Sequence, residues 1–410
     1  MLDFDLTDPH IVRDPYPLFE ALRQQAPVVW SNALDGWMAV SYDAVKQAAR
    51  GSEFSVDTLS PFFATRTGDV TIQELATYVR HWLIFTDPPK HTRMRAVMNR
   101  GFAASRIAGM EALVRKYVQR LLDAIGDRDE IDLIADFAFA LPAMVIAGMI
   151  GVPDAVIPHV QGWSDDLGEF IASAPGSEKY QKAQAGGRAM ADCFRELIAE
   201  RRRQPTDDLL SGLVQARDQG YFASDEELIS NCILLLFAGH ETTTNLITNG
   251  MYHLLQNPAQ YALLRDNPDV SVTAVEEMLR YENPVNGLTR LVLRDTELAG
   301  HPLREGERVF AFIPAANRDP AKFAEPNRMD ITRKPNPHLS FGSGIHLCLG
   351  APLARLEARV VFDMLPKWLH APELVTTEPE WKALLVLRGM KALRIRFTPL
   401  SQREQRRAAG

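Results

Sequence analysis

The chain has 410 residues, 46% hydrophobic and 24% charged, which fits an ordinary globular protein with a sizeable core. Its formal net charge of -7 gives no general basis for binding nucleic acid. The three cysteines, Cys193, Cys232 and Cys348, are far apart and odd in number, so a disulfide framework is not expected and a reducing cytoplasm is favoured. The N-terminus lacks the basic start and apolar run of a signal peptide, and the longest apolar run, 232–239, is too short to span a bilayer. We therefore expect a soluble cytoplasmic protein with no membrane partner.

Helical patterns dominate the predicted elements. Residues 54–85 mix aromatic and polar side chains, and we interpret them as a long, partly irregular connection. From Pro88 to about Tyr281, apolar residues recur at three- and four-residue spacing, which predicts helices. Within this region, Ser224 and the acids after it form an N-cap pattern that opens one unusually long, buried helix. Glycine turns and β-prone runs after residue 290, and again near the end of the chain, predict small sheets.

One cysteine, Cys348, lies in a glycine-rich loop, "FGSGIHLCLG", directly before a predicted helix. The glycines let the backbone approach something large and flat, and Pro352 marks the first helical turn. The positive end of the helix dipole favours a thiolate, which suits an axial ligand of haem iron. Taken alone, a buried structural cysteine is the commoner explanation. A zinc site would need two ligands besides His346 and Cys348, and the spacing offers none.

This loop resembles the haem-binding loop of the cytochrome P450 family at every defined position, namely Phe341, Gly342, Gly344, His346, Cys348 and Gly350. Four other segments match the family in the right order, so the resemblance covers essentially the whole chain. It implies a mainly α-helical fold with small β-sheet regions. It also implies one haem domain over residues 1–400, followed by a polar tail over residues 401–410.

The second matching segment is "AGHETT", residues 238–243, in the middle of the long predicted helix. The resemblance implies that Ala238 lies beside the haem and that Glu241 and Thr242 are catalytic. Cleaving the O–O bond of dioxygen requires two protons inside a dry pocket, and a hydroxyl with a nearby carboxylate can relay them. A helix that holds an acid and several threonines by chance is the alternative. Such residues are poor choices for so apolar a helix centre.

Further matches concern the haem carboxylates and the support of the haem. The resemblance implies that His91 and Arg95, in "DPPKHTRMR", bind the haem propionates together with Arg290 and His346. Buried carboxylates need cations and hydrogen bonds, which explains these residue types. Each residue, taken alone, would more often lie at the surface.

The segment "EEMLRY" matches the family's Glu-x-x-Arg pattern with Glu277 and Arg280. Residues three apart share one face of a helix. The resemblance implies a buried pair joined by an arginine from a later loop, for which Arg328 fits. These three residues are expected to be structural.

The resemblance implies a haem-thiolate monooxygenase that contains haem b. It would use O2 and two electrons from a ferredoxin and its reductase, or from a fused reductase, to oxidise an apolar small molecule. A peroxide-driven peroxygenase and a haem sensor without turnover remain alternatives. Arg93, Arg100, Arg355 and Arg359 are expected to form a basic docking patch near Cys348. The segments that line the family's substrate pocket include a strand near Leu385, and supply here Phe62, Phe63, Leu83, Phe170, Leu234, Val285, Leu288 and Val386.

Overall fold

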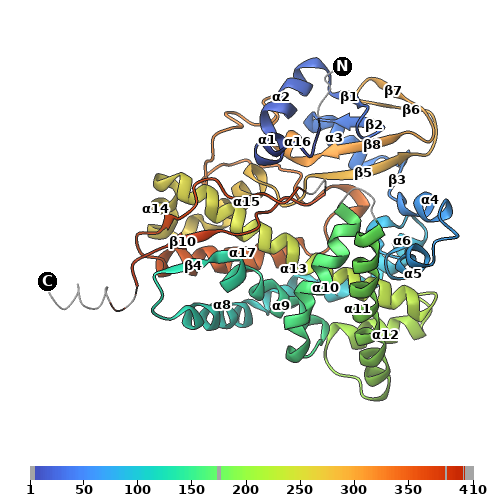
Figure 1. The fold of residues 1–410 in the computed structure, drawn as a ribbon, viewed down its shortest axis with the longest axis horizontal. Coiled ribbons are helices and arrows are strands. Elements are labelled where there is room, and N and C mark those ends of the chain that lie inside the picture. Colours follow the sequence, from blue (N-terminus) through green and yellow to red (C-terminus); the bar gives the residue numbers. More distant parts are fainter. Residues whose placement is uncertain (1–4, 173–176, 384–385, 400, 402–410) are drawn as a thin grey trace.

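The computed structural model describes residues 5–172, 177–383, 386–399 and 401, and its fold is mainly α-helical, as predicted (Figure 1). The strand predicted near Leu385, and residues 402–410 of the predicted tail, lie outside the described residues. The helices are α1 Pro9–Arg13, α2 Tyr16–Gln25, α3 Tyr42–Arg50, α4 Leu59–Ala64, α5 Val70–Val79, α6 Lys90–Gly101, α7 Ala104–Ala108, α8 Glu111–Ile125, α9 Ala140–Ile150, α10 Ile157–Ala172, α11 Ser177–Arg203, α12 Leu209–Asp218, α13 Asp225–Gln256, α14 Pro258–Asp266, α15 Ser271–Tyr281, α16 Ile313–Asn317 and α17 Ala351–Trp368. Among the described residues, no helix combines the length and apolarity needed to cross a membrane.

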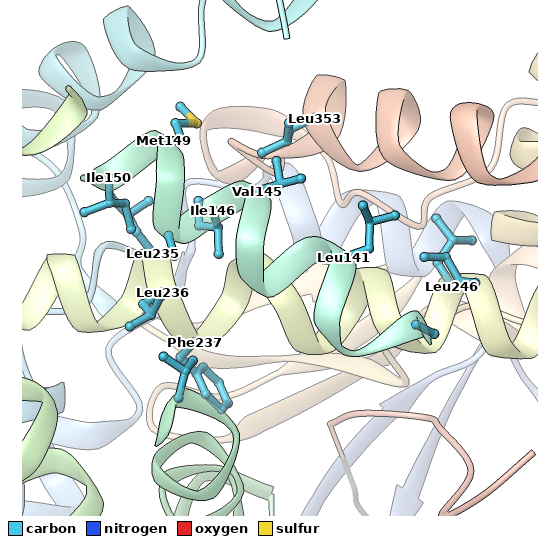
Figure 2. Packing of buried hydrophobic residues seen from close by; sticks show 14 of the residues in the cluster. Leu141, Val145, Ile146, Met149, Ile150, Leu235, Leu236, Phe237, Leu246 and Leu353 are labelled. Carbon is cyan, nitrogen blue, oxygen red and sulfur yellow. The ribbon is translucent and has the colours of Figure 1, made fainter. Parts of the chain in front are cut away.

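The long helix α13 runs through the middle of the molecule (Figure 1). Its 32 residues correspond to about 48 Å of helix. The hydroxyl of Ser224 accepts a hydrogen bond from the backbone N–H of Glu227, so the predicted N-cap and the predicted long helix are confirmed. Figure 2 shows α9 lying along α13, and α17 also packs against α13. A side chain at Gly239 would meet Ile146 of α9 at 2.6 Å, so glycine permits this close approach.

Residues 54–85 are more regular than predicted. They contain α4, α5 and a short 3₁₀ turn, Leu83–Phe85, so only the stretches between these elements form the irregular connection that was predicted. The reason is local. The Asp69 side chain caps α5 by accepting from the N–H of Ile72, and the apolar residues of α5 then face the core.

The main sheet lies at one end of the molecule, covered by the N-terminal helices (Figure 1). Its strand order is β1-β2-β8-β5-β3, with β2 and β8 parallel and the other neighbours antiparallel. Two smaller sheets have the orders β4-β10-β9 and β6-β7. The strands are β1 Val28–Ser31, β2 Gly36–Ala39, β3 Phe54–Ser55, β4 Glu130–Asp132, β5 Gly287–Val292, β6 Thr296–Leu298, β7 His301–Leu303, β8 Arg308–Phe312, β9 Glu373–Leu374 and β10 Arg394–Arg396.

A buried ion pair on α15 organises the segment that leads to Cys348. Glu277 and Arg280 have fully buried side chains and form two hydrogen bonds of 2.8 Å. The arginine also donates to the carbonyl oxygens of Asn317, Pro326 and Arg328. The pair therefore ties α15 to the chain between α16 and the Cys348 loop.

The predicted role of Arg328 is wrong. Its side chain is 62% exposed and pairs with Glu325, while Arg333 donates to Glu277 at 3.1 Å. Arg328 contributes only its carbonyl oxygen to Arg280. Both arginines lie on the same loop, and the path of that loop turns Arg333 inward.

We predict that Glu277→Gln lowers the free energy of unfolding by about 3–5 kcal/mol, because the change leaves two arginines buried beside an uncharged partner. Chemical denaturation of the cofactor-free protein would measure this loss. Glu325→Gln is the matched control, since Glu325 and Arg328 have the same three-residue spacing but are exposed. Equal effects of the two substitutions would contradict the structural role of Glu277.

Candidate active site

A cavity of about 600 Å³ lies between the centre of α13, the Cys348 loop and the inner ends of β5 and β8. Its wall brings together Ala238, Glu241 and Thr242 from α13 with Cys348 from the loop. Ala238 is exposed although its neighbours on α13 are buried, which is the mark of a residue facing an internal space. The two segments singled out in the sequence therefore meet in one cavity.

Backbone hydrogen bonds hold Cys348. Its N–H donates to the carbonyl of Phe341 at 2.9 Å, which closes the glycine loop. Gly342 and Gly344 have φ of 73° and 77°, conformations that favour glycine. Cys348 faces the cavity but is enclosed by the protein around it, and this desolvation raises the pKa of its thiol, while the N–H of Gly350 and the Arg95 guanidinium act in the opposite direction. Cys348 is exposed on the cavity wall and directly precedes α17, so its sulfur is available as a ligand.

Four basic side chains converge beside this loop. The rings of His91 and His346 lie 4.1 Å apart, and both nitrogens of His91 and Nε2 of His346 are buried without a hydrogen-bond partner. Arg95 reaches the carbonyl of Leu347 at 2.7 Å. Arg290 is 6% exposed and donates only to backbone carbonyl oxygens within the described part of the chain. Burial lowers the pKa of Arg290 to about 10, although the negative charge of Asp87 acts in the opposite direction.

These basic groups fit a dianionic cofactor. Burial, with the charges of neighbouring His91 and Arg290, lowers the pKa of His346 to about 3. Buried cations and unpartnered imidazoles are unfavourable unless an anion accompanies them. Two propionate groups of a haem would supply that charge and accept those hydrogen bonds. The donor set thus agrees with a haem whose iron is held by Cys348, with His91, Arg95, Arg290 and His346 around its carboxylates.

The acid and threonine of α13 have different surroundings. The hydroxyl of Thr242 donates to the carbonyl of Ala238 at 3.0 Å. Glu241 forms a 3.0 Å ion pair with Lys382, and the two side chains are 12% and 30% exposed. Lys382 is the more exposed partner, so it lies on the solvent side of the Glu241 carboxylate. Nothing in the sequence around Lys382 indicated this pairing, because the two residues are 141 positions apart.

A second carboxyl group lines the cavity and was missed in the sequence. Glu357 on α17 is fully buried, and neither of its oxygens has a partner. Burial raises the pKa of this carboxyl well above its usual value, which favours its neutral form. The signal was present, since Glu357 follows Leu353 by four residues and therefore falls on the apolar face of its helix.

The rest of the wall is apolar and rich in aromatic rings. Seven of the eight residues predicted for the substrate pocket line it, namely Phe62, Leu83, Phe170, Leu234, Val285, Leu288 and Val386. Phe63 does not, because it is buried behind Phe62 and stacks on Phe170 at 6.2 Å. The sequence missed Trp82, Phe237 and Tyr180, which also line the cavity. Phe170 and Tyr180 contact Phe62 edge-on and link α4 to α10 and α11.

The basic patch predicted near Cys348 is largely neutralised. Glu227 pairs with Arg93, Glu276 with Arg355 and Glu111 with Arg359. Arg100 has no carboxylate partner among the described residues, and it lies near the ring of Tyr221. The prediction of four available cations is therefore wrong for three of them. The neutralising carboxylates come from other elements and were not visible in the local sequence.

Comparison with known proteins agrees with this geometry. The cytochrome P450 family model matches residues 172–367. A putative cytochrome P450, YjiB of Bacillus subtilis, is 38% identical over 390 residues, covering 93% of this chain and 94% of the relative. Among solved structures, P450BioI in complex with hexadec-9Z-enoic acid ligated acyl carrier protein is 34% identical with a TM-score of 0.89, covering 95% of this chain and 99% of that one. CYP109E1 of Bacillus megaterium in complex with testosterone is also 34% identical, with a TM-score of 0.85 and coverages of 95% and 99%. The chain belongs to the cytochrome P450 family and is a haem-iron monooxygenase that uses O2.

Proposed function

We propose that this enzyme holds haem b through Cys348 and oxidises an apolar small molecule with two electrons from a ferredoxin. The observation that carries the proposal is the backbone-held Cys348 in the same cavity as Thr242 and Glu241. When bound, the haem supplies the activation of dioxygen and the transfer of one oxygen atom to the substrate. The surrounding residues hold the cofactor, exclude water and deliver protons.

Cys348→Ser is expected to remove the red-shifted Soret band that the reduced, carbon-monoxide-bound protein shows when a thiolate ligates haem iron. A serine hydroxyl at the same position offers no thiolate. Absorption spectroscopy of the reduced protein under carbon monoxide measures the band. Cys193→Ser is the control and should retain it, because half-buried Cys193 does not line the cavity. A band that survives in Cys348→Ser would overturn the ligand assignment.

Thr242 and Glu241 are proposed to deliver protons. The Thr242 hydroxyl lies on the wall of the cavity that Cys348 also lines, and it donates to the carbonyl of Ala238 within the same helix. Glu241 is paired with half-exposed Lys382, so its carboxylate lies between the cavity and the solvent side. The apolar and aromatic wall keeps other water away, which leaves this route as the defined one.

Replacing Thr242 with alanine should leave substrate binding intact and lower the product formed per electron several-fold, with the missing electrons recovered as hydrogen peroxide. The reason is that the hydroxyl acts on proton delivery and makes no contribution to holding the substrate. Product, reductant consumption and peroxide are measured on one sample. Thr242→Ser keeps the hydroxyl and should remain close to the wild type. An unchanged ratio of product to reductant in Thr242→Ala would refute the role.

An apolar substrate is supported by the wall of the cavity and by the ligands of related structures. Aromatic and aliphatic residues dominate the wall, as in most small-molecule sites. P450BioI was solved with an acyl chain on its carrier protein, and CYP109E1 with testosterone. These two ligands share an apolar body and little else. We therefore propose a lipid-like or terpenoid-like substrate of this general class.

The electron donor is proposed to dock on the face of the Cys348 loop. Ile345 and Leu347 in this loop are 57% and 46% exposed, and Arg100 on neighbouring α6 carries an unneutralised charge. Exposed apolar residues beside a cation suit an acidic protein partner with an apolar contact. The three unpaired cysteines further support a reducing cytoplasm as the location.

Arg100→Glu is expected to slow ferredoxin-supported turnover several-fold at low ionic strength, because charge reversal removes the electrostatic attraction. The difference from the wild type should shrink as salt rises, since screening acts over about 8 Å at physiological ionic strength. Steady-state turnover over a salt series measures both effects. Arg304→Glu, an exposed position between β7 and β8, controls for net charge. Equal slowing in both variants, or in peroxide-supported turnover, would argue against a docking role.

A further inference from the structure

Positive charges exceed negative charges along the wall of the cavity. Of its two carboxyl groups, Glu241 pairs with Lys382, and Glu357 is fully buried without a partner, so that its neutral form is favoured. Two of its arginines, Arg95 and Arg290, belong to the group beside the Cys348 loop. The remaining cation on the wall is Arg308, which has no part in that group.

Arg308 lies at the outer end of the cavity. It is the first residue of β8, whose last residue, Phe312, is about 13 Å away along the strand. Side chains alternate along a strand, so Arg308 and Phe310 share one face, and both line the cavity. Arg308 is exposed and Phe310 is half-buried. Ile313, which follows β8 and also lines the cavity, is only 1% exposed. The wall thus changes from charged and wet to apolar and dry.

The neighbouring strand β2 has a glycine, Gly36, next to Arg308 and Phe310 of β8. A side chain at Gly36 of β2 would lie 2.9 Å from the ring of Phe310 and 3.1 Å from Cβ of Arg308. The first contact is shorter than real side chains show and the second is tighter than most, so a side chain at position 36 would displace the ring of Phe310 or the stem of Arg308. With glycine there, both side chains pack directly on the backbone of β2.

The guanidinium of Arg308 has no carboxylate partner within the described part of the chain. The adjacent Glu307 does not neutralise it, because its carboxylate accepts from the indole of Trp37 and the N–H of Arg304, both at 2.9 Å. An arginine in this state can offer two parallel N–H donors to a planar anion.

We propose that Arg308 binds the carboxylate of an amphipathic substrate, whose apolar chain extends along Phe310 and Leu288 toward Cys348. This inference rests on the proposed function, in which the cavity is the substrate site. It narrows the substrate class to carboxylic acids with a long apolar body. Ligands with a cationic head are disfavoured, because no free carboxylate lines the described wall to receive them.

The test compares ligands of equal chain length and different heads. Tetradecanoate, tetradecanol and tetradecyltrimethylammonium, whose quaternary nitrogen cannot ligate iron, are titrated into the haem-loaded protein, and binding is followed by the shift of the Soret band and by calorimetry. The wild type should bind the acid about 3- to 10-fold more tightly than the alcohol, as expected for a charge-assisted contact at an exposed site, and the cationic ligand most weakly. Arg308→Met should remove the preference for the acid and leave binding of the alcohol unchanged.

Two further variants separate a charge effect from damage to the sheet. Arg308→Lys keeps the charge and should restore part of the preference, while Arg304→Met removes an exposed arginine outside the cavity and should change nothing. The proposal fails if the wild type binds the acid and the alcohol equally, if Arg308→Met keeps the preference, or if the acid does not bind. A normal carbon-monoxide spectrum from the same samples would show that the haem-thiolate assignment stands independently of that failure.

Discussion

The position of the Cys348 loop depends on one buried carboxylate, that of Glu277. Residues 318–343 contain no helix or strand, so no regular backbone hydrogen bonding fixes them. The carboxylate of Glu277 takes the place of such bonding. It accepts hydrogen bonds from the side chains of Arg280, Arg333 and Asn336 and from the backbone N–H of Asp330. The end of this segment is fixed by Ser340, whose hydroxyl donates to a carbonyl oxygen of α15 at 2.7 Å. The Cys348 loop is thereby anchored to α15, which lies far from that loop in the sequence.

The chemistry of the cavity follows from how its charges are compensated. Beside the cysteine loop, basic groups outnumber acids and favour a cofactor that brings its own negative charge. On α13 the acid forms an ion pair with a lysine that is partly in solvent. On α17 the acid is buried without a partner, and this burial raises the pKa of its carboxyl, which favours the neutral form. Two glutamates on the same cavity thus have different surroundings, one paired with a cation and the other alone.

Local patterns in the sequence predicted much of this arrangement. The Ser224 cap, the apolar period after it and the glycines around Cys348 indicated the long helix and the ligand loop, because each depends on neighbouring residues. The resemblance to a known family supplied the residues expected around the haem carboxylates. The predictions that failed, and the contacts that were missed, depend on the path of the chain in space. Choosing Arg333 over Arg328 requires knowing which way a loop turns, and Lys382 meets Glu241 only through tertiary structure.

The segment from Trp381 to Met390 contributes both to the ion pair of Glu241 and to the wall of the cavity. Lys382 near its start holds the acid of α13, and Val386 and Leu387 form part of the cavity wall. The backbone bridges Val285–Leu387 and Trp381–Met390 tie its described parts to the rest of the fold. Substitutions here that reshape the pocket for a different molecule will also disturb the acid's counter-ion. The shape of the pocket and the pairing of Glu241 are therefore mechanically linked, and changing one without the other requires compensating changes elsewhere on the cavity wall.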